Sequence, residues 1–528
     1  MSVFVLADAC ECEGENISRI LDKLTKDGSP CKLLGDPRRF THHRVTTLPG
    51  LFMTAYKQAR LEKNERQILL SHEDHLIAIQ LCLAEMNKQN IGDFDVEMSK
   101  VLEMSRKINK KKLTNVESED LFDDIDEELS KLFDAYKEFL QSCNVYDMAD
   151  LFRAVLDNSC LDVVESVFEG SNFILLQAPS TDLEKEMLQF VCRGKALVKL
   201  TCEEELNEGG DVNIMTEDVA DVDDIIALLK KHGPSTSPIS VTEGHVRGIF
   251  VSYLHLLVNS RNELSLARVI NIPDRELDQQ AFTDIKRVAK EKNMSMCQVA
   301  LSYVMKIRLG GRSYAPDPNS PLGPHVKGLG DFTDLIHKLQ MFAEEEPDVK
   351  TSISKVIRVI KNAIVKCKET LIKTDSVERV AETITKDALT LSENVEELYG
   401  CSPERKASEG GSALGRKTLK VFRALTDEES TLPFTSKAAY ILSDIMSSQK
   451  TPIRFPCLLS KFRSPENLDE IVDEPELNAP LAHRLKAKFH GDTPKVCTWT
   501  CVVKKTLFVH FKTTCTFINI KLNICIHF

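Results

Sequence analysis

Residues 246–311 constrain the fold of this chain more than any other segment, because apolar side chains recur there at helical spacing in three stretches. Apolar residues three and four positions apart form one stripe on a helix, and that stripe must be buried. Pro273 cannot sit inside a helix, so it separates the first stretch from the second. Ser295 and Gln298 have the spacing of a capping box that opens the third stretch, and Gly310 ends it. The segment predicts three short helices packed around one seam.

The order of motifs over residues 240–345 resembles the second accessory domain of UvrD-type superfamily 1 DNA helicases. More specifically, it is similar to the PCNA-interacting partner family, also called PARI, the PCNA-associated recombination inhibitor. The segments that carry this similarity are 250–254, 257–260, 271–275, 281–284, 310–316 and 325–329. The similarity is dense over 240–345 and thinner over 60–190. It is not found before residue 50 or after about residue 430.

The resemblance implies a mainly α fold with a small α/β part, arranged as a degenerate UvrD-type helicase with a helical accessory domain and a disordered tail. It implies a non-enzymatic, DNA-binding regulator of DNA repair that suppresses inappropriate homologous recombination. The implied partners are DNA, PCNA and the recombinase filament protein at replication forks, with poly(ADP-ribose) polymerase as a further candidate. The implied location is the nucleus, with the cytoplasm as a second.

The 528 residues are enough for two to four domains. Changes in composition and periodicity along the chain suggest where these begin and end. We expect a poorly ordered segment at 1–50, a degenerate helicase-like domain without Walker motifs at 51–200, an acidic linker at 201–239, the accessory-like helical domain at 240–345, a pair of basic and acidic helices at 346–400, and a linker with a largely disordered tail at 401–528.

A strand, loop and helix pattern occurs at 68–87, and its helix is so apolar that we expect it to be buried on most sides. The pattern stands where a UvrD-type helicase has its phosphate-binding loop. Such a loop needs glycines that let backbone N–H groups approach the phosphates, a lysine, and Ser or Thr for magnesium. This loop has neither glycine nor lysine. Its two carboxylates would repel a triphosphate, since two like charges near 4 Å cost roughly 4 kcal/mol at an effective dielectric of about 20.

The second half of a nucleotide site is missing too. The apolar strand at 172–176 is followed by Gln-Ala-Pro instead of the Asp-Glu pair that binds magnesium and activates water. We therefore expect no ATPase activity and no cofactor. The degenerate nucleotide site is predicted at Ser71, His72, Glu73, Asp74, Gln177 and Ala178.

Local charge decides where nucleic acid could bind, because the chain as a whole is acidic. Eighty Asp and Glu against 68 Lys and Arg give a net charge of −12, which argues against a surface uniformly coated for nucleic acid. Residues 261–312 reverse the sign with ten basic against six acidic residues, and 350–373 have seven against one. Basic side chains along a helix can follow a phosphate backbone. The candidate DNA contacts are Arg261, Arg268, Arg275, Lys286, Lys290, Lys355 and Arg358, and the alternative for each is a solvated helix charge.

The sixteen cysteines are scattered without a paired CxxC, a pattern typical of reduced thiols in a cytosolic or nuclear protein. Cys497, Cys501, His510 and Cys515 are metal-ligating residue types, but their spacing is irregular, so no metal site is expected. The sequence has no signal peptide pattern and no uncharged apolar run near the roughly 18 to 20 residues of a membrane span. We expect no membrane partner.

Two other functions remain open. One is an active ATP-dependent DNA helicase, and the other is a protein-only interaction scaffold that uses acidic segments such as 203–224, where ten acids occur without Lys or Arg. The family is expected to bind PCNA through a C-terminal peptide of the form Gln-x-x-aliphatic-x-x-aromatic-aromatic, and no such octapeptide occurs in this chain. PCNA is therefore implied by the resemblance alone.

Overall fold

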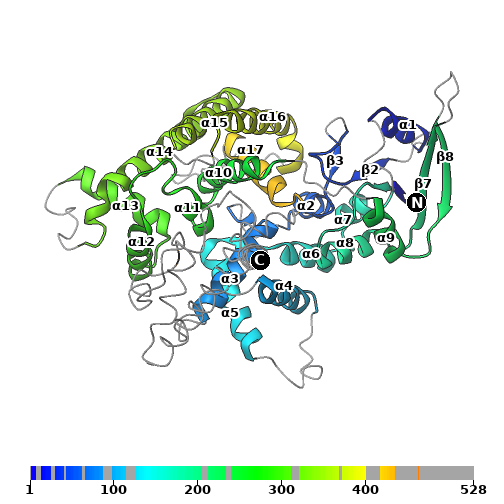
Figure 1. The fold of residues 1–528 in the computed structure, drawn as a ribbon, viewed down its shortest axis with the longest axis horizontal. Helices are drawn as coiled ribbons and strands as arrows, with labels where there is room; N and C mark the ends of the chain where they lie inside the picture. Colours follow the sequence, from blue (N-terminus) through cyan, green and yellow to red (C-terminus); the bar gives the residue numbers. More distant parts are fainter. Residues whose placement is uncertain are drawn as a thin grey trace, which may run out of the picture.

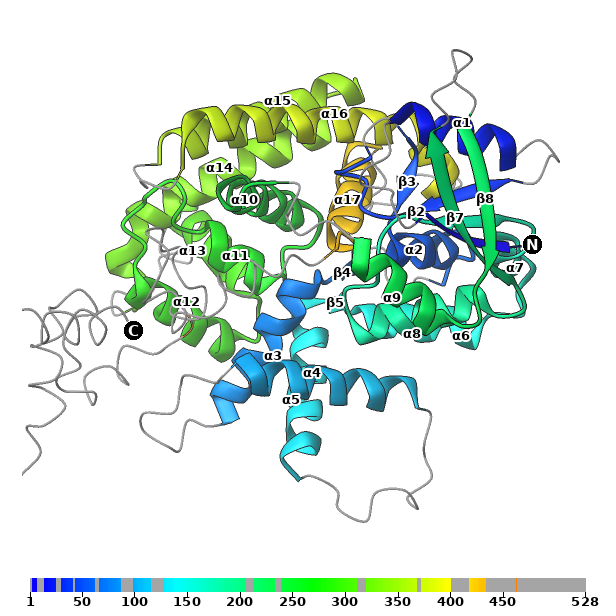
Figure 2. The ribbon, with the colours of Figure 1, turned by 45° about the vertical axis from the view of Figure 1, so that its right-hand side comes forward.

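Two halves lie side by side in the computed structural model, one built around a six-stranded sheet and the other made of helices (Figures 1 and 2). Among the described residues, no helix is long and apolar enough to cross a membrane. The structure describes residues 2–6, 14–24, 30–40, 43–61, 66–86, 98–114, 127–204, 212–232, 239–310, 320–367, 372–399, 417–433 and 462.

The large sheet has the strand order β3-β2-β6-β1-β7-β8. All its neighbouring strands are parallel except β7 and β8, which pair antiparallel. β1 lies inside the sheet, where Val5 is opposite Leu175 on one side and Lys199 on the other. The strands are β1 (Ser2–Leu6), β2 (Cys31–Leu34), β3 (Val45–Thr46), β6 (Asn172–Leu175), β7 (Ala196–Glu204) and β8 (Val212–Asp218).

Side chains alternate across this sheet and so form two separate cores. Phe173 and Leu175 pack with helices α2, α6, α7, α8 and α9 on one face. Ile174 and Leu176 pack with Ile17 and Ile20 of α1 on the other. These helices are α1 (Gly14–Leu24), α2 (Leu48–Gln58), α6 (Met148–Asp157), α7 (Asp162–Phe168), α8 (Asp182–Cys192) and α9 (Val222–His232).

A second, two-stranded parallel sheet consists of β4 (Ile68–Leu69) and β5 (Val145–Tyr146). The helix after β4 is buried along most of its length, as its continuous apolar run predicts: every residue from Asp74 to Ala84 is buried. It shares one core with its two neighbours and with the helical half. These three helices are α3 (His72–Met86), α4 (Met98–Leu113) and α5 (Glu127–Cys143).

The helical half contains the three helices predicted around Pro273, as α10, α12 and α13, and adds a fourth, α11, between the first two. Ser295 and Gln298 form the expected capping box at the start of α13, and Gly310 ends that helix with a φ of +63°. The stripe that includes Phe250 and Tyr253 is fully buried. The helices are α10 (Val241–Val258), α11 (Glu263–Val269), α12 (Gln279–Lys292), α13 (Met296–Leu309), a 3-10 turn (Gly323–His325), α14 (Val326–Glu345), α15 (Val349–Val365), α16 (Thr374–Tyr399) and α17 (Lys417–Ser430).

Helix α17 lies between the two halves (Figures 1 and 2). Its Asp427 accepts a hydrogen bond of 2.5 Å from Lys57 of α2, and both side chains are almost completely buried. Ser430 donates to the carbonyl of Leu69 in β4 at 2.9 Å. Arg247 of α10 donates to Glu429 at 2.8 Å. One helix therefore bonds to α2 of the sheet half, to the two-stranded sheet and to the helical half.

Three expected segments differ from the structure. The N-terminal segment expected to be poorly ordered supplies β1, β2 and β3, because its short apolar runs pair with strands far away in the sequence. The segment expected to be an acidic linker contains most of the β7–β8 hairpin and α9, since the apolar residues between its acids pair along β7. The segment from residue 401 contains the buried helix α17; the rest of the expected tail, apart from 431–433 and Phe462, lies outside the described residues.

The mainly helical class with a small α/β part is confirmed. The basic and acidic helices expected at 346–400 are α15 and α16, which pack against each other. The UvrD-type arrangement of these elements stays a prediction.

Candidate nucleic-acid interface and nucleotide-site region

The loop predicted to replace a phosphate-binding loop is largely the first turn of α3. Ser71 caps this helix by accepting a hydrogen bond of 3.1 Å from the backbone N–H of Asp74. The Asp74 side chain is buried and forms an ion pair with Arg268 of α11. Asp74 was expected at the degenerate nucleotide site and Arg268 at the DNA contact. The structure instead joins these two residues to each other.

Burial also shifts the pKa values of the other two side chains in this turn, His72 and Glu73. It lowers the pKa of His72 to about 3, and the neighbouring His75 adds to this shift. Burial raises the pKa of Glu73, while Arg268 opposes the rise. Neither side chain resembles the lysine that would neutralise phosphate charge in a nucleotide-binding loop.

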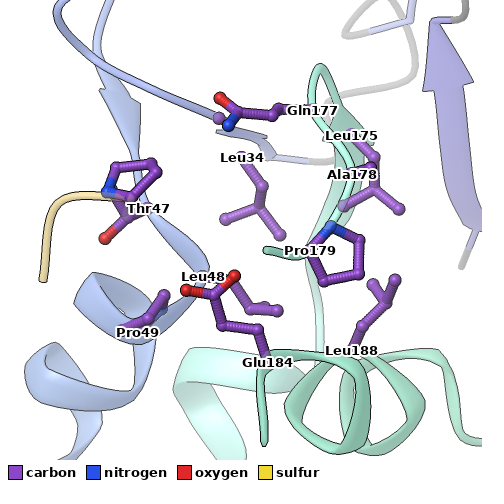
Figure 3. Close-up of a pocket in the computed structure, with 12 residues that line it drawn as sticks. Leu34, Thr47, Leu48, Pro49, Leu175, Gln177, Ala178, Pro179, Glu184 and Leu188 are labelled. Atoms are coloured by element: carbon purple, nitrogen blue, oxygen red, sulfur yellow. The ribbon is translucent and has the colours of Figure 1, made fainter. Parts of the chain in front are cut away.

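Gln177 and Ala178 follow the carboxyl end of β6 and line a pocket at that edge of the sheet (Figure 3). Ligands of open α/β sheets bind at the carboxyl ends of strands. β2 and the start of α2 contribute Leu34, Thr47 and Pro49 to the same pocket. A second pocket next to it is lined by His72 and His75, and the two pockets share Pro49 and Glu184. The fold therefore places the two parts of the predicted site near one another, although their strands belong to different sheets.

Glu184 is a pocket carboxylate that the sequence analysis missed. Its Oε2 accepts hydrogen bonds from the backbone N–H and the hydroxyl of Ser180, at 2.6 and 2.7 Å, and burial raises its pKa. Thr181 caps the same helix by accepting from the Glu184 N–H. The pattern Thr-x-x-Glu, a capping box signature, could have revealed it.

The chemistry available at this edge is limited. Each pocket encloses about 30 Å³, which is room for about two water molecules. The carboxylate that lines both pockets, Glu184, already accepts two hydrogen bonds from Ser180, and Gln177 and Ala178 supply no negative charge for magnesium. Among the described residues there is no group of three or more His, Cys, Asp or Glu able to hold a metal ion. The candidate ligands Cys497, Cys501, His510 and Cys515 lie outside them.

A buried polar network beside the second pocket was also missed. His75 lies 2.6 Å from the Tyr136 hydroxyl and 2.8 Å from the Ser105 hydroxyl. Tyr136 donates to Asp147 at 2.9 Å, and Lys112 donates to the same carboxylate at 2.6 Å. Burial lowers the pKa of His75 to about 4. The network joins α3, α4 and α5 to the start of α6, so its role is to hold these helices together, and only the fold brings its members into contact.

Arg275, a candidate DNA contact, is buried beneath α14. One guanidinium nitrogen donates to the carbonyls of Val269, Ile270 and Ile272, at 3.2, 2.8 and 2.9 Å, and the other donates to the Tyr253 hydroxyl at 3.2 Å. Val269 is the last residue of α11 and Ile270 and Ile272 follow it, so the guanidinium bonds to carbonyls at and just after the C-terminal end of this helix. Arg275 therefore holds the turn around Pro273 and does not offer its charge to solvent.

Gly328, in the segment 325–329 that carries the family similarity, allows α14 to lie close to the turn around Pro273. A Cβ at this position of α14 would lie 2.3 Å from the carbonyl oxygen of Arg275. Contacts this short do not occur in proteins, so α14 can approach the turn only because residue 328 has no side chain.

The remaining candidate DNA contacts lie on two separate surfaces. In both views α15 runs along the top of the helical half and α12 lies below it (Figures 1 and 2). On α15, Lys355 is ion-paired with Glu346, while Arg358 is exposed. On α12, Lys286 is ion-paired with Glu85 at 2.8 Å and Lys290 is exposed. The structure does not bring the seven candidates together.

A group of exposed cations lies around the end of α12. Lys290 and Lys292 are exposed on its last turn, and Arg261 is exposed on the turn before α11. The Ser295 hydroxyl, just after α12, donates to the carbonyl of Ser260 at 3.3 Å, so the two turns are neighbours. No ion pair to a described residue occupies any of these three cations. We call Arg261, Lys290 and Lys292 the α12 basic cluster.

Replacement of Arg275 by methionine (R275M) should destabilise the helical half by about 3 kcal/mol, because buried carbonyls and a hydroxyl lose charged hydrogen bonds. The check is the unfolding free energy from urea titration followed by circular dichroism. R261M, the same change at an exposed arginine, should cost less than about 0.5 kcal/mol. Equal stabilities of R275M and R261M would contradict the structural role of Arg275.

Comparison with known proteins agrees with the motifs in the sequence. Residues 45–166 match the family model described as the PCNA-interacting partner N-terminal domain. This range runs from β3 to α7 and includes the buried network around His75 and Asp147. The matched range therefore includes the degenerate turn at the start of α3.

Curated relatives extend the similarity well beyond that range. The PCNA-interacting partner of Homo sapiens is 32% identical over 426 residues, which is 78% of this chain and 66% of the relative. The protein of the same name from Bos taurus is 29% identical over 429 residues, with the same coverage. That from Danio rerio is 29% identical over 429 residues, 77% of this chain and 66% of the relative. This chain thus spans 66% of the length of these relatives, and it belongs to the PCNA-interacting partner family.

Proposed function

We propose that this chain is a non-enzymatic DNA-binding protein that acts with PCNA and restrains homologous recombination at replication forks. The observation that carries the DNA-binding part is the α12 basic cluster, whose three cations are exposed and unpaired among the described residues in a chain of net charge −12. Unpaired lysines and arginines bind DNA phosphates favourably because this contact releases counterions condensed on the DNA. Lys286 and Lys355 are weaker candidates, since each already has a carboxylate partner.

The recombination part follows from family membership and from DNA binding together. A protein that binds DNA without translocating along it can occupy DNA that a recombinase filament would otherwise cover. The recombinase filament protein and poly(ADP-ribose) polymerase remain proposed partners, and the nucleus, with the cytoplasm as a second location, is the proposed place of action. A protein-only scaffold is the alternative, and DNA affinity separates the two.

Reversal of two charges in the α12 basic cluster (K290E/K292E) should weaken duplex binding about tenfold or more at 0.1 M salt. It should also reduce the slope of log affinity against log salt by roughly 2, because each lost phosphate contact removes about 0.9. Fluorescence anisotropy with a labelled duplex measures both quantities.

The matched control is K230E/K231E, which makes the same charge change near the end of α9, where both lysines are also exposed. It should bind within about twofold of the unchanged chain. Equal losses in the two variants would show that net charge, and not the α12 surface, governs binding. Absence of any salt-dependent DNA binding by the unchanged chain would favour the protein-only scaffold.

The proposal that the chain is not an ATPase rests on the two altered parts of the nucleotide site. Asp74 is bound by Arg268, and Gln177 and Ala178 stand where magnesium and water need carboxylates. Phosphate release from magnesium ATP, with and without duplex or single-stranded DNA, should equal the rate without protein. DNA-stimulated hydrolysis that is lost in Q177A or R268M would support the helicase alternative instead.

PCNA is proposed as a partner because the relatives carry the name PCNA-interacting partner. The 528 residues contain no Gln-x-x-aliphatic-x-x-aromatic-aromatic octapeptide, so the test asks whether they contact PCNA without one. Immobilised PCNA should bind this chain, and a synthetic peptide with that octapeptide should not compete. Competition by the peptide would place the contact in the usual peptide groove, and no binding at micromolar concentrations would remove PCNA as a direct partner of this chain.

A further inference from the structure

Phe462, which lies 32 residues after the end of α17 in the sequence, packs on α12. Its side chain is only 9% exposed and belongs to the same apolar core as the helical half. The ring lies 5.0 Å from the ring of Phe282, at an interplanar angle of 79°. Edge-to-face contacts of this kind are favourable because the positive edge of one ring meets the negative face of the other.

A cation completes the contact. Lys286 Nζ lies 5.7 Å from the centre of the Phe462 ring, within the range of a cation–π interaction. The same ammonium lies 2.8 Å from Glu85 of α3, which fixes its position next to the ring. Phe282, Lys286 and Lys290 are spaced by four residues, so they follow one stripe along α12.

We propose that Phe282 and Lys286 of α12 form a docking site for an aromatic side chain, and that Phe462 of the same chain is its occupant. The site holds Phe462 against the helical half, beside Lys290 of the α12 basic cluster. The argument stands on packing and is independent of whether that cluster binds DNA. Because Phe462 is tethered to the site, a free peptide must overcome its high effective concentration.

The test uses the full chain with F462A, which empties the site, and a fluorescein-labelled peptide of residues 458–468. Anisotropy should show saturable binding of this peptide to the F462A chain. Binding to the unchanged chain should be at least about tenfold weaker, because its own ring competes. The same peptide carrying F462A should not bind either chain.

A second variant tests the cation without disturbing the core. K286M keeps the aliphatic stem and should weaken peptide binding to the F462A chain by about two- to fivefold, the loss expected for a cation–π contact. K306M makes the same change at an exposed lysine of α13 and should have no effect. The proposal is overturned if the F462A chain does not bind the peptide, or if the peptide carrying F462A binds equally well. Equal affinity of the unchanged and F462A chains would overturn Phe462 as the occupant.

Discussion

The burial of charged residues on α17 is the constraint on which the rest of the structure depends. A helix that carries Asp427 and Glu429 can be buried only if each carboxylate meets a cation, because an unpaired charge in a core costs several kcal/mol. Lys57 of the sheet half and Arg247 of the helical half supply those cations. The two partners come from opposite sides, so satisfying α17 fixes the position of one half relative to the other.

The need to pair buried charges also explains why two candidate DNA contacts, Arg268 and Arg275, do not face phosphate. Arg268 and Arg275 carry charges that a surface would offer to phosphate, yet both are used inside the protein. Arg268 compensates the buried Asp74, and Arg275 satisfies the last carbonyls of α11. Two consequences follow together. Asp74 in the first turn of α3 is paired within the protein, and the cations left for the proposed DNA contact are those that no described carboxylate holds.

The proposed function joins these features. A chain without the groups that use ATP, but with an exposed basic cluster at the end of α12, can hold DNA without moving along it. The Phe462 docking site lies on the same helix, where Phe282 and Lys286 occupy the positions before Lys290. Position along one stripe of α12 therefore places Phe462 next to the surface proposed to contact DNA.

Sequence alone determined the features that depend on neighbouring residues. The helices around Pro273, the capping box at Ser295 and the burial of α3 were predicted because spacing, capping and proline act within one or two turns. The missing glycines, lysine and carboxylates were equally plain, since those motifs are short. Only the tertiary structure decided what depends on distant partners: β1 inside the sheet, α17 between the halves, the pairing of Arg268 with Asp74 and the burial of Arg275. The physical reason is that strand pairing and charge compensation join residues far apart in the chain, so neither leaves a local pattern that could be read in advance.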